Sequence, residues 1–191
     1  MDDLYITDRT YTPKELEATG LPKAEYDGCI FRQLDLSGID LTGFTFMDCR
    51  FEACNLVNAG MKGASLKGVA FSDCKLTGIH FQDCLKFLFS VSFERCKLDL
   101  VSFHGMPLKE TVFQDCGLQE SDLTESDLSG ARFERCDLSA ALFEGTNLEK
   151  CDLRTAVNYS IDPARNRIRK ARFSLAGLPG LLDRYGIDIE A

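Results

Sequence analysis

Apolar residues recur at every fifth position along most of this chain. Phe, Leu or Met occupies each fifth place from Phe31 to Phe81 and again from Leu88 to Leu153, which makes twenty-five units. A half-buried strand would repeat every two residues, and an amphipathic helix would place apolar residues at i, i+3, i+4 and i+7. The five-residue period fits neither pattern, and it predicts a solenoid whose coils stack on one another.

The position two residues before each of these apolar centres is usually Cys, Ala or another small residue. We therefore expect it to point inward as well. The remaining three positions carry Asp, Asn, Glu, Lys, Arg, Ser, Gln and Gly, and we expect them to face water or to form corners. The small inward residues are Cys29, Cys49, Cys54, Ala59, Ala64, Cys74, Cys96, Cys116, Ala131, Cys136, Ala141 and Cys151.

A longer period of twenty residues is superimposed on the first. Phe31, Phe51, Phe71, Phe93, Phe113 and Phe133 follow it, apart from one step of twenty-two. Four five-residue units therefore make one coil with a square cross-section. We predict an all-β solenoid, a quadrilateral parallel β-helix of about six coils and about 30 Å in length, given strands roughly 4.8 Å apart.

The ends of a solenoid expose apolar surface and need caps. We divide the chain into an N-terminal cap (1–28), the repeat (29–157) and a C-terminal cap and dimerisation segment (158–191). Thr12-Pro13-Lys14-Glu15 predicts a helix start with Thr12 as N-cap. Ser174 to Tyr185 predicts a short C-terminal helix, and Ile187 and Ile189 alternate like a final strand.

The register breaks once, where Cys84-Leu85-Lys86-Phe87 adds two residues to a coil. We expect a bulge at one corner, either as a tolerated insertion or as a small contact loop. Lys86, Phe87 and Phe89 are candidates for exposure, and Lys86 and Phe87 are the candidate contact residues.

The charge is acidic, with 30 Asp and Glu against 22 Lys and Arg and a net charge of -8. This balance opposes direct binding to nucleic-acid phosphates and favours a basic partner surface. No uninterrupted apolar run approaches membrane-spanning length, so we expect no membrane role. Most of the nine cysteines occupy fixed repeat positions and no signal peptide precedes them, which favours a reduced, cytoplasmic protein.

Six acids lie between Lys109 and Arg132 without an intervening base. In a wound rod they would spread over about one coil, where they could imitate a line of phosphates or simply form a solvated polar face. They are Glu110, Asp115, Glu120, Asp122, Glu125 and Asp127. A basic stretch, Arg165 to Arg172, is better explained by capping of coil carbonyls or by pairing with an acidic partner.

Catalytic and metal sites have little support. The cysteine column has no C-x-x-C pair, whereas tetrahedral zinc needs four converging ligands. His80 and His104 lie at outward positions without a phased nucleophile and carboxylate. We therefore expect no enzyme, no cofactor and no metal site.

The motif of a small residue, Asp or Asn, and Leu, as in Ser121-Asp122-Leu123 and Cys151-Asp152-Leu153, resembles the pentapeptide-repeat family. That resemblance implies a right-handed quadrilateral β-helix. The tail, with Asn158-Tyr159-Ser160-Ile161-Asp162-Pro163 and Ile187-Asp188-Ile189, is similar to that of bacterial topoisomerase-protecting members, which include quinolone-resistance and toxin-immunity proteins.

This resemblance implies a rod that mimics duplex DNA, binds DNA gyrase or topoisomerase IV, and forms a head-to-head homodimer through its tail. The candidate dimerisation residues are Leu178, Leu181, Leu182, Tyr185 and Ile187. The chain lacks the two long loops of some resistance proteins, so the loop-poor members are the closer comparison. The alternative is an interaction scaffold with no connection to topoisomerases.

Overall fold

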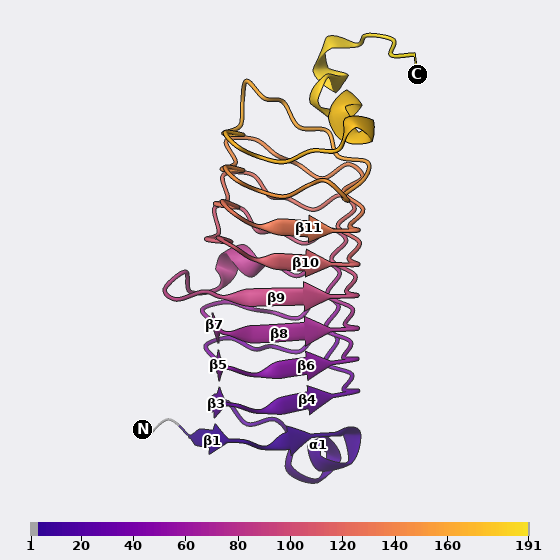
Figure 1. Cartoon of the computed structure of the whole chain (residues 1–191). Coiled ribbons are helices and arrows are strands. Elements are labelled where there is room, and N and C mark those ends of the chain that lie inside the picture. The colour runs from indigo at the N-terminus through magenta and orange to yellow at the C-terminus, as the bar shows by residue number, and fades with distance from the viewer. Residues whose placement is uncertain (1–3, 191) are drawn as a thin grey trace.

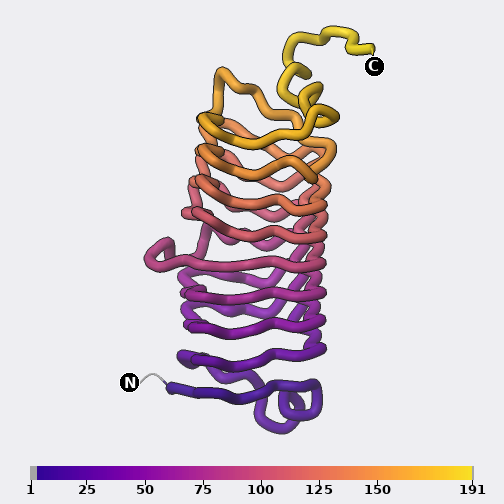
Figure 2. The backbone as a smooth tube through the Cα atoms, viewed as in Figure 1, coloured from indigo at the N-terminus to yellow at the C-terminus, as the bar shows by residue number. Residues whose placement is uncertain are grey.

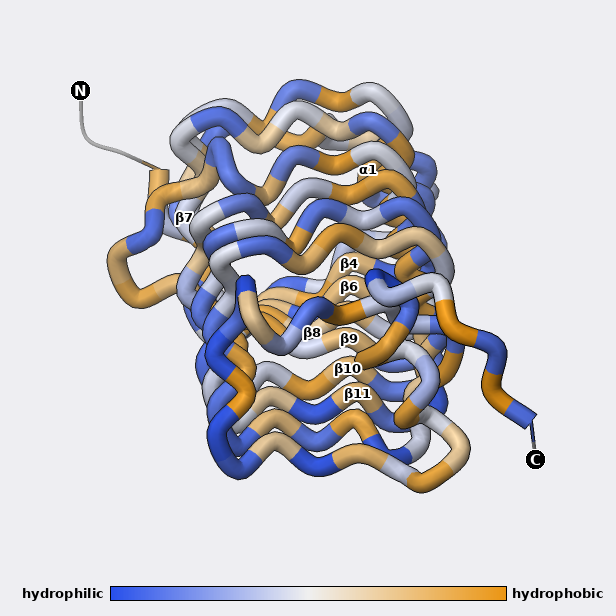
Figure 3. Tube along the Cα trace, turned by 90° about the horizontal axis from the view of Figure 1, so that it is seen from above, coloured by the Kyte–Doolittle hydropathy of each residue, from blue (hydrophilic) through white to orange (hydrophobic). Residues whose placement is uncertain are grey.

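A computed structural model describes residues 4–190 of the chain. The chain winds into a rod of stacked coils, with its N-terminal strands at one end and a helical segment at the other (Figures 1 and 2). Hydrophobic and hydrophilic residues alternate around each coil when the rod is viewed along its length (Figure 3). The predicted solenoid is confirmed.

All paired strands are parallel and belong to two sheets, which occupy two adjacent sides of the rod. The four-stranded sheet has the order β1-β3-β5-β7, and the seven-stranded sheet has the order β11-β10-β9-β8-β6-β4-β2. The strands are β1 (Tyr5–Thr7), β2 (Thr10–Tyr11), β3 (Glu25–Asp27), β4 (Ile30–Arg32), β5 (Thr45–Met47), β6 (Arg50–Glu52), β7 (Ser65–Lys67), β8 (Val69–Ser72), β9 (Val91–Glu94), β10 (Val112–Gln114) and β11 (Arg132–Glu134).

The twenty-residue period is the register of the larger sheet. Phe31 pairs with Phe51, Phe51 with Phe71, and the column continues to Phe133 across the step of twenty-two residues. Neighbouring rings stack with centroids 4.6 Å apart at Phe31 and Phe51 and 4.7 Å apart at Phe113 and Phe133. These rings are fully buried, so stacked aromatic columns form much of the interior.

Each corner is turned by a residue two places after the apolar centre, in the left-handed backbone region. Non-glycine residues there have φ values from 49° to 61°, and glycine takes the same place at positions such as Gly38 and Gly43. The left-handed conformation is most accessible to Gly, Asn and Asp. The polar and glycine-rich composition of this position therefore follows from the turn that it makes.

The ends of the rod differ from its middle. At the N-terminal end, α1 (Pro13–Thr19) begins as predicted, and the Glu15 carboxylate accepts a hydrogen bond from the backbone N–H of Thr12 at 3.2 Å. Parallel pairing extends outside residues 29–157, because β1 and β2 pair with β3 and β4 and Asp152 bridges to Arg172. The C-terminal helical cap consists of two 3-10 helices, η2 (Leu175–Leu181) and η3 (Asp183–Tyr185).

All nine cysteines are free and buried, including Cys84 beside the register break. The sulfur atoms of seven of them contact backbone carbonyls of their own coil or of the preceding one, as Cys54 does with Phe31 O at 3.2 Å. The prediction that they act as small buried side chains is confirmed.

Candidate functional site

The six predicted acids form a ring around one coil. Glu110, Asp115, Glu120 and Glu125 occupy four successive corners, with φ values of 57°, 53°, 55° and 57°. Asp122 and Asp127 lie on the sides between these corners, where they bridge to neighbouring coils. The acids therefore point to different sides of the rod and do not make one line parallel to its axis.

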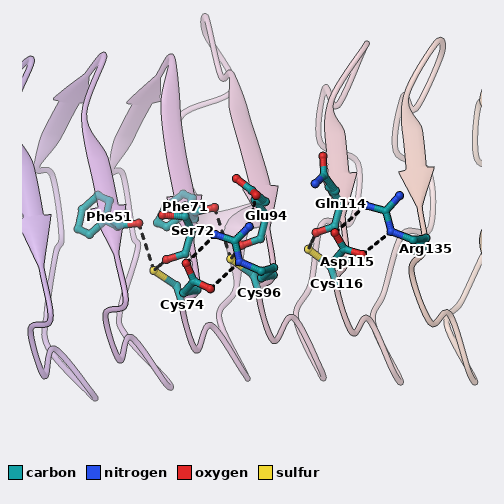
Figure 4. Close-up of polar contacts among 12 residues, drawn as sticks. Phe51, Phe71, Ser72, Cys74, Glu94, Cys96, Gln114, Asp115, Cys116 and Arg135 are labelled. Atoms are coloured by element: carbon teal, nitrogen blue, oxygen red, sulfur yellow. Dashed lines mark hydrogen bonds and ion pairs between the residues drawn. The ribbon is translucent and has the colours of Figure 1, made fainter.

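Some of these carboxylates are compensated by bases one coil away. Asp115 forms a bidentate pair with Arg135, with N–O distances of 2.5 and 2.7 Å, and this contact lowers the pKa of Asp115 (Figure 4). Asp127 pairs with Lys109 at 3.4 Å. Partial burial raises the pKa of Asp127, but hydrogen bonds from Ser129 outweigh it and the net shift is downward.

Glu120, Asp122 and Glu125 remain close together on one side of the rod. No ion pair to Glu120 occurs among residues 4–190. His104 lies between the other two, with Nδ1 3.9 Å from Asp122 and Nε2 3.6 Å from Glu125. The segment from Glu120 to Glu125 thus spans one side of the rod from corner to corner.

We call this side the acidic side. Its buried centres are Leu41, Met61, Phe81, Phe103, Leu123 and Phe143. It carries both histidines of the chain and few bases. Lys62 lies in the N-terminal half, and Arg165, near the C-terminus, pairs with Glu144. Its acids are Asp40, Asp83, Glu120, Asp122, Glu125, Glu144 and Asp162, the last of which pairs with Arg184.

The acidic side has no nucleophile–base pair of the kind used in hydrolases. Ser102 lies one coil below Asp122, but its hydroxyl donates to Gln82, and both ring nitrogens of His104 face carboxylates. Among the described residues there is no group of three or more His, Cys, Asp or Glu with metal-binding geometry.

The inserted residues project from the rod as an apolar bulge (Figure 1). The ladder is regular at Leu85, whose N–H donates to Ala64 O, and it resumes at Ser90, whose N–H donates to Leu66 O. Between them Leu88 takes a left-handed conformation with φ of 57°. Leu85, Phe87 and Leu88 are 52%, 76% and 61% exposed, so the tip is strongly apolar.

The structure corrects two assignments in this bulge. Leu88 continues the fifth-residue series in the sequence but is exposed, and Phe89, a candidate for exposure, is buried against Phe81 with ring centroids 6.3 Å apart. The left-handed turn at Leu88 directs the next side chain inward, so Phe89 fills the interior. Lys86 and Phe87 are exposed, and the amine of Lys86 lies near Gly105 on the next coil.

The C-terminal helices form a second exposed apolar surface. Leu178, Leu182, Tyr185 and Ile187 are 40%, 37%, 61% and 54% exposed, whereas Leu181 packs partly against the core. Leu175 and Ile189, which were not among the candidates, are 85% and 51% exposed. These side chains gather at one end of the rod.

The same helices are fixed to the last coil by specific contacts. The N–H of Ile161 donates to Gly180 O at 2.8 Å, and Arg184 pairs with both carboxylate oxygens of Asp162 at 2.5 Å. Gly177 and Gly180 lie directly on Tyr159, so closely that a Cβ at either position would overlap it. The apolar end surface therefore has a defined orientation on the rod.

The basic stretch belongs to the last coil. Arg167 and Arg172 bridge to Asn147 and Asp152, and Arg165 pairs with Glu144 at 2.9 Å. Arg172 also forms an ion pair with Asp152 at 3.3 Å. These contacts agree with a structural role for the stretch.

No helix within residues 4–190 has the length and apolar character required to cross a membrane. Comparison with curated proteins gave no match. Among solved structures, a trypsin-treated form of QnrB1, a plasmid-mediated fluoroquinolone resistance protein, is 20% identical with a TM-score of 0.49, and the match covers 98% of each chain.

A second solved structure is HetL, a pentapeptide repeat protein involved in heterocyst differentiation regulation from the cyanobacterium Nostoc sp. It is 17% identical with a TM-score of 0.33, and the match covers 91% of this chain and 85% of HetL. A family model described as a pentapeptide repeat region matches residues 23–85 and 86–158. Because the family model matches well over half of the chain, and the parallel coils follow the same repeat, the protein belongs to the pentapeptide-repeat family.

Proposed function

We propose that this protein binds the DNA-binding region of a bacterial type II topoisomerase, DNA gyrase or topoisomerase IV, in place of DNA, and so protects or modulates that enzyme. The observation that carries the proposal is the acidic side, on which Asp40, Asp83 and the segment from Glu120 to Glu125 place carboxylates outward with few bases. The similarity of the tail to topoisomerase-protecting members supports the choice of partner.

The physical basis is electrostatic. A groove that binds duplex DNA is lined with Lys and Arg, and it attracts a rod that carries outward carboxylates. Coils of the rod repeat roughly every 4.8 Å, whereas duplex DNA carries one phosphate per about 1.7 Å of helix axis. The charge density is lower than that of DNA, so we expect the affinity to depend strongly on salt and on the exposed acids.

The bulge adds an apolar contact beside this charged surface. Phe87 projects next to the coil that carries Asp83, at the edge of the acidic side. An exposed aromatic side chain is an effective anchor when it enters a pocket of a partner. We therefore include Lys86 and Phe87 in the proposed contact surface.

The C-terminal apolar surface is proposed to form a homodimer. Leu175, Leu178 and Leu182 lie exposed on helices that are fixed to the rod. Pairing of two such ends would double the length of the rod and bury these side chains.

The function can be tested by titrating the protein into gyrase supercoiling assays with and without a cleavage-stabilising inhibitor. Restored supercoiling with the inhibitor would identify a protector, and inhibition of the drug-free enzyme would identify a modulator. The variant Glu120→Lys with Glu125→Lys should lose either effect, because it reverses two charges of the acidic side. The fold should tolerate both substitutions, because Lys150 and Lys170 adopt the same corner conformation.

The matched control carries Glu17→Lys and Glu149→Lys. These substitutions change the net charge by the same amount, but both lie away from the acidic side. If the wild-type protein has no effect in either assay, the interaction-scaffold function takes precedence. Equal effects of the two variants would instead show that net charge, and not the acidic side, governs the interaction.

A further inference from the structure

Five cysteines form a continuous column along one inner corner of the rod. Cys54, Cys74, Cys96, Cys116 and Cys136 lie one coil apart, and their exposed fractions are 1%, 1%, 2%, 2% and 0%. The residues that follow them pair in parallel register, from Asn55 and Lys75 up to Gly117 and Asp137. The sulfur atoms of Cys74, Cys96 and Cys116 follow one another along this corner in Figure 4.

The column has defined ends. The equivalent position one coil below Cys54 is Leu34, and the one above Cys136 is Ala156, both buried. Within the column each thiol has another thiol directly above or below it, and four of the five thiols donate to a backbone carbonyl oxygen of the preceding coil. Only two thiols meet at any point between coils, so a tetrahedral zinc site cannot form there.

The distance between coils matches a different kind of metal site. Parallel strands are roughly 4.8 Å apart, and a metal–thiolate bond to a first-row ion is about 2.3 Å. Two such bonds in a straight line span about 4.6 Å. A cation placed midway between two stacked cysteines would therefore reach both sulfur atoms with little movement of the backbone.

We propose that adjacent cysteines of this column bind Cu(I), or a cation of the same soft monovalent class, as a linear dithiolate. Soft thiolate ligands select such cations over Mg²⁺ or Ca²⁺. Five thiols provide two separate pairs, so the column holds two cations. Cys29 and Cys49, which stack one coil apart at another corner, form one further pair of the same geometry.

Binding would exchange protons for metal. Each pair of thiols releases two protons and accepts one Cu(I), which leaves a complex of charge minus one and requires no change in oxidation state.

Binding would break only weak hydrogen bonds, but the buried sulfur atoms are difficult for a cation to reach. The contacts that the thiols would give up are to carbonyl oxygens, such as Cys74 to Phe51 O at 3.3 Å and Cys136 to Phe113 O at 3.4 Å, and S–H is a weak donor. The sulfur atoms are buried, so a cation must enter while a corner opens locally. Uptake should therefore be slow and accelerated by mild warming.

The proposal can be tested with the full-length, reduced protein titrated anaerobically with Cu(I) against a coloured Cu(I) chelator. The wild-type chain should retain three equivalents. Cys74→Ala with Cys116→Ala removes every adjacent pair of the column, since the remaining three cysteines are two coils apart, and this variant should retain one equivalent. Ala occupies the same repeat position elsewhere, for example at Ala156, so the variant should fold.

The control variant, Cys84→Ala with Cys151→Ala, removes two cysteines that have no thiol one coil away and should retain three equivalents. X-ray absorption should detect two sulfur neighbours for each Cu(I), and circular dichroism should verify that both variants fold. Retention of no copper by wild type, equal retention by the two variants, or coordination by nitrogen or oxygen would each overturn the proposal.

Discussion

Several ion pairs on the surface of this protein join residues one coil apart. Arg32 pairs with Glu52 and Arg135 with Asp115, each twenty residues away, while Arg95 reaches Asp73 across the inserted residues. All six side chains are substantially exposed, so each pair contributes little to stability. The first two pairs could have been predicted by writing the sequence in rows of twenty, because Arg32 and Arg135 then lie next to Glu52 and Asp115 in the adjacent row. The pair of Arg95 and Asp73 requires in addition that the two inserted residues be recognised.

Among individual residues, several aspartates should make the stability of the fold depend on pH. Hydrogen bonds from Ser139 and Asn158 lower the pKa of Asp137, and those from Arg154 lower the pKa of Asp152. Because folding lowers these values, the stabilisation is complete above the ordinary Asp pKa of about 3.9 and is lost as pH falls through the folded values.

The thermal midpoint should therefore be nearly constant from about pH 7 to pH 5 and decrease below about pH 4. Asp137→Asn should weaken that decrease, and Glu17→Gln on α1 is the control. A midpoint that stays constant down to about pH 2.5 would contradict this prediction.

The position of a phenylalanine in the repeat should determine how much it contributes to the free energy of unfolding. Phe113 is fully buried between Phe93 and Phe133, whereas Phe87 is 76% exposed. Phe113→Ala should lower the free energy of unfolding by about 3 to 5 kcal/mol, and Phe87→Ala should change it by about 0.5 kcal/mol or less. Denaturant unfolding of the two variants measures the difference. Equal losses would refute the stacked-column interior.

At the scale of elements, the bulge is a place where the five-residue spacing no longer predicts which residues are buried. The spacing placed the register break between Phe81 and Leu88, and the ladder is interrupted between Leu85 and Ser90. The spacing could not specify where the chain returns to the interior. The left-handed turn at Leu88 decides this and exchanges the roles of Leu88 and Phe89. Local backbone geometry, which the spacing does not contain, therefore determines the exposed residues.

The tail shows a related effect. The fifth-residue apolar series ends at Leu153, yet the bridges continue to Arg172 with Tyr159, Ile161 and Asn166 buried in the last turn. Asn166 substitutes for an apolar inward residue because its amide donates to Phe143 O and to Asp162 O, both at 2.9 Å. A buried polar side chain that satisfies its hydrogen bonds is invisible to a hydrophobic pattern.

The attachment of the C-terminal helices should depend on two glycines. Because a Cβ on Gly177 or Gly180 would overlap Tyr159, Gly177→Ala with Gly180→Ala should detach η2 and η3 while the coils remain folded. Limited proteolysis should then cleave near residue 174 much faster than in wild type. Ala176→Ser, an exposed neighbour in η2, is the control, and an unchanged cleavage rate in the glycine variant would contradict the prediction.

At the scale of the whole molecule, sequence reasoning predicted the architecture more fully than the surface. The inward columns follow directly from a repeat in which each large apolar residue has a fixed place, as the series from Phe31 to Phe133 demonstrates. The acids from Glu110 to Asp127 look like one cluster in the sequence, but four corners distribute them around the coil. Which acids remain uncompensated depends on bases one coil away, such as Arg135.

Dimerisation through the C-terminal end is testable on the intact chain. Leu178→Ser with Leu182→Ser should convert a dimer into a monomer in light scattering at micromolar concentration, because it replaces exposed apolar side chains at the proposed contact. Leu100→Ser changes a more exposed leucine on a mid-rod corner and should leave the dimer intact. A wild-type chain that is monomeric under these conditions would exclude this arrangement.

The most direct test of the proposed function is competition for the DNA-binding region of gyrase. A labelled DNA duplex bound to the enzyme is titrated with this protein at low and high salt, and its release is followed by fluorescence anisotropy. We predict release at low salt, progressive weakening as salt increases, and a large loss of potency in Glu120→Lys with Glu125→Lys. Absence of release at low salt, or release that is insensitive to both salt and charge reversal, would contradict the DNA-mimic mechanism.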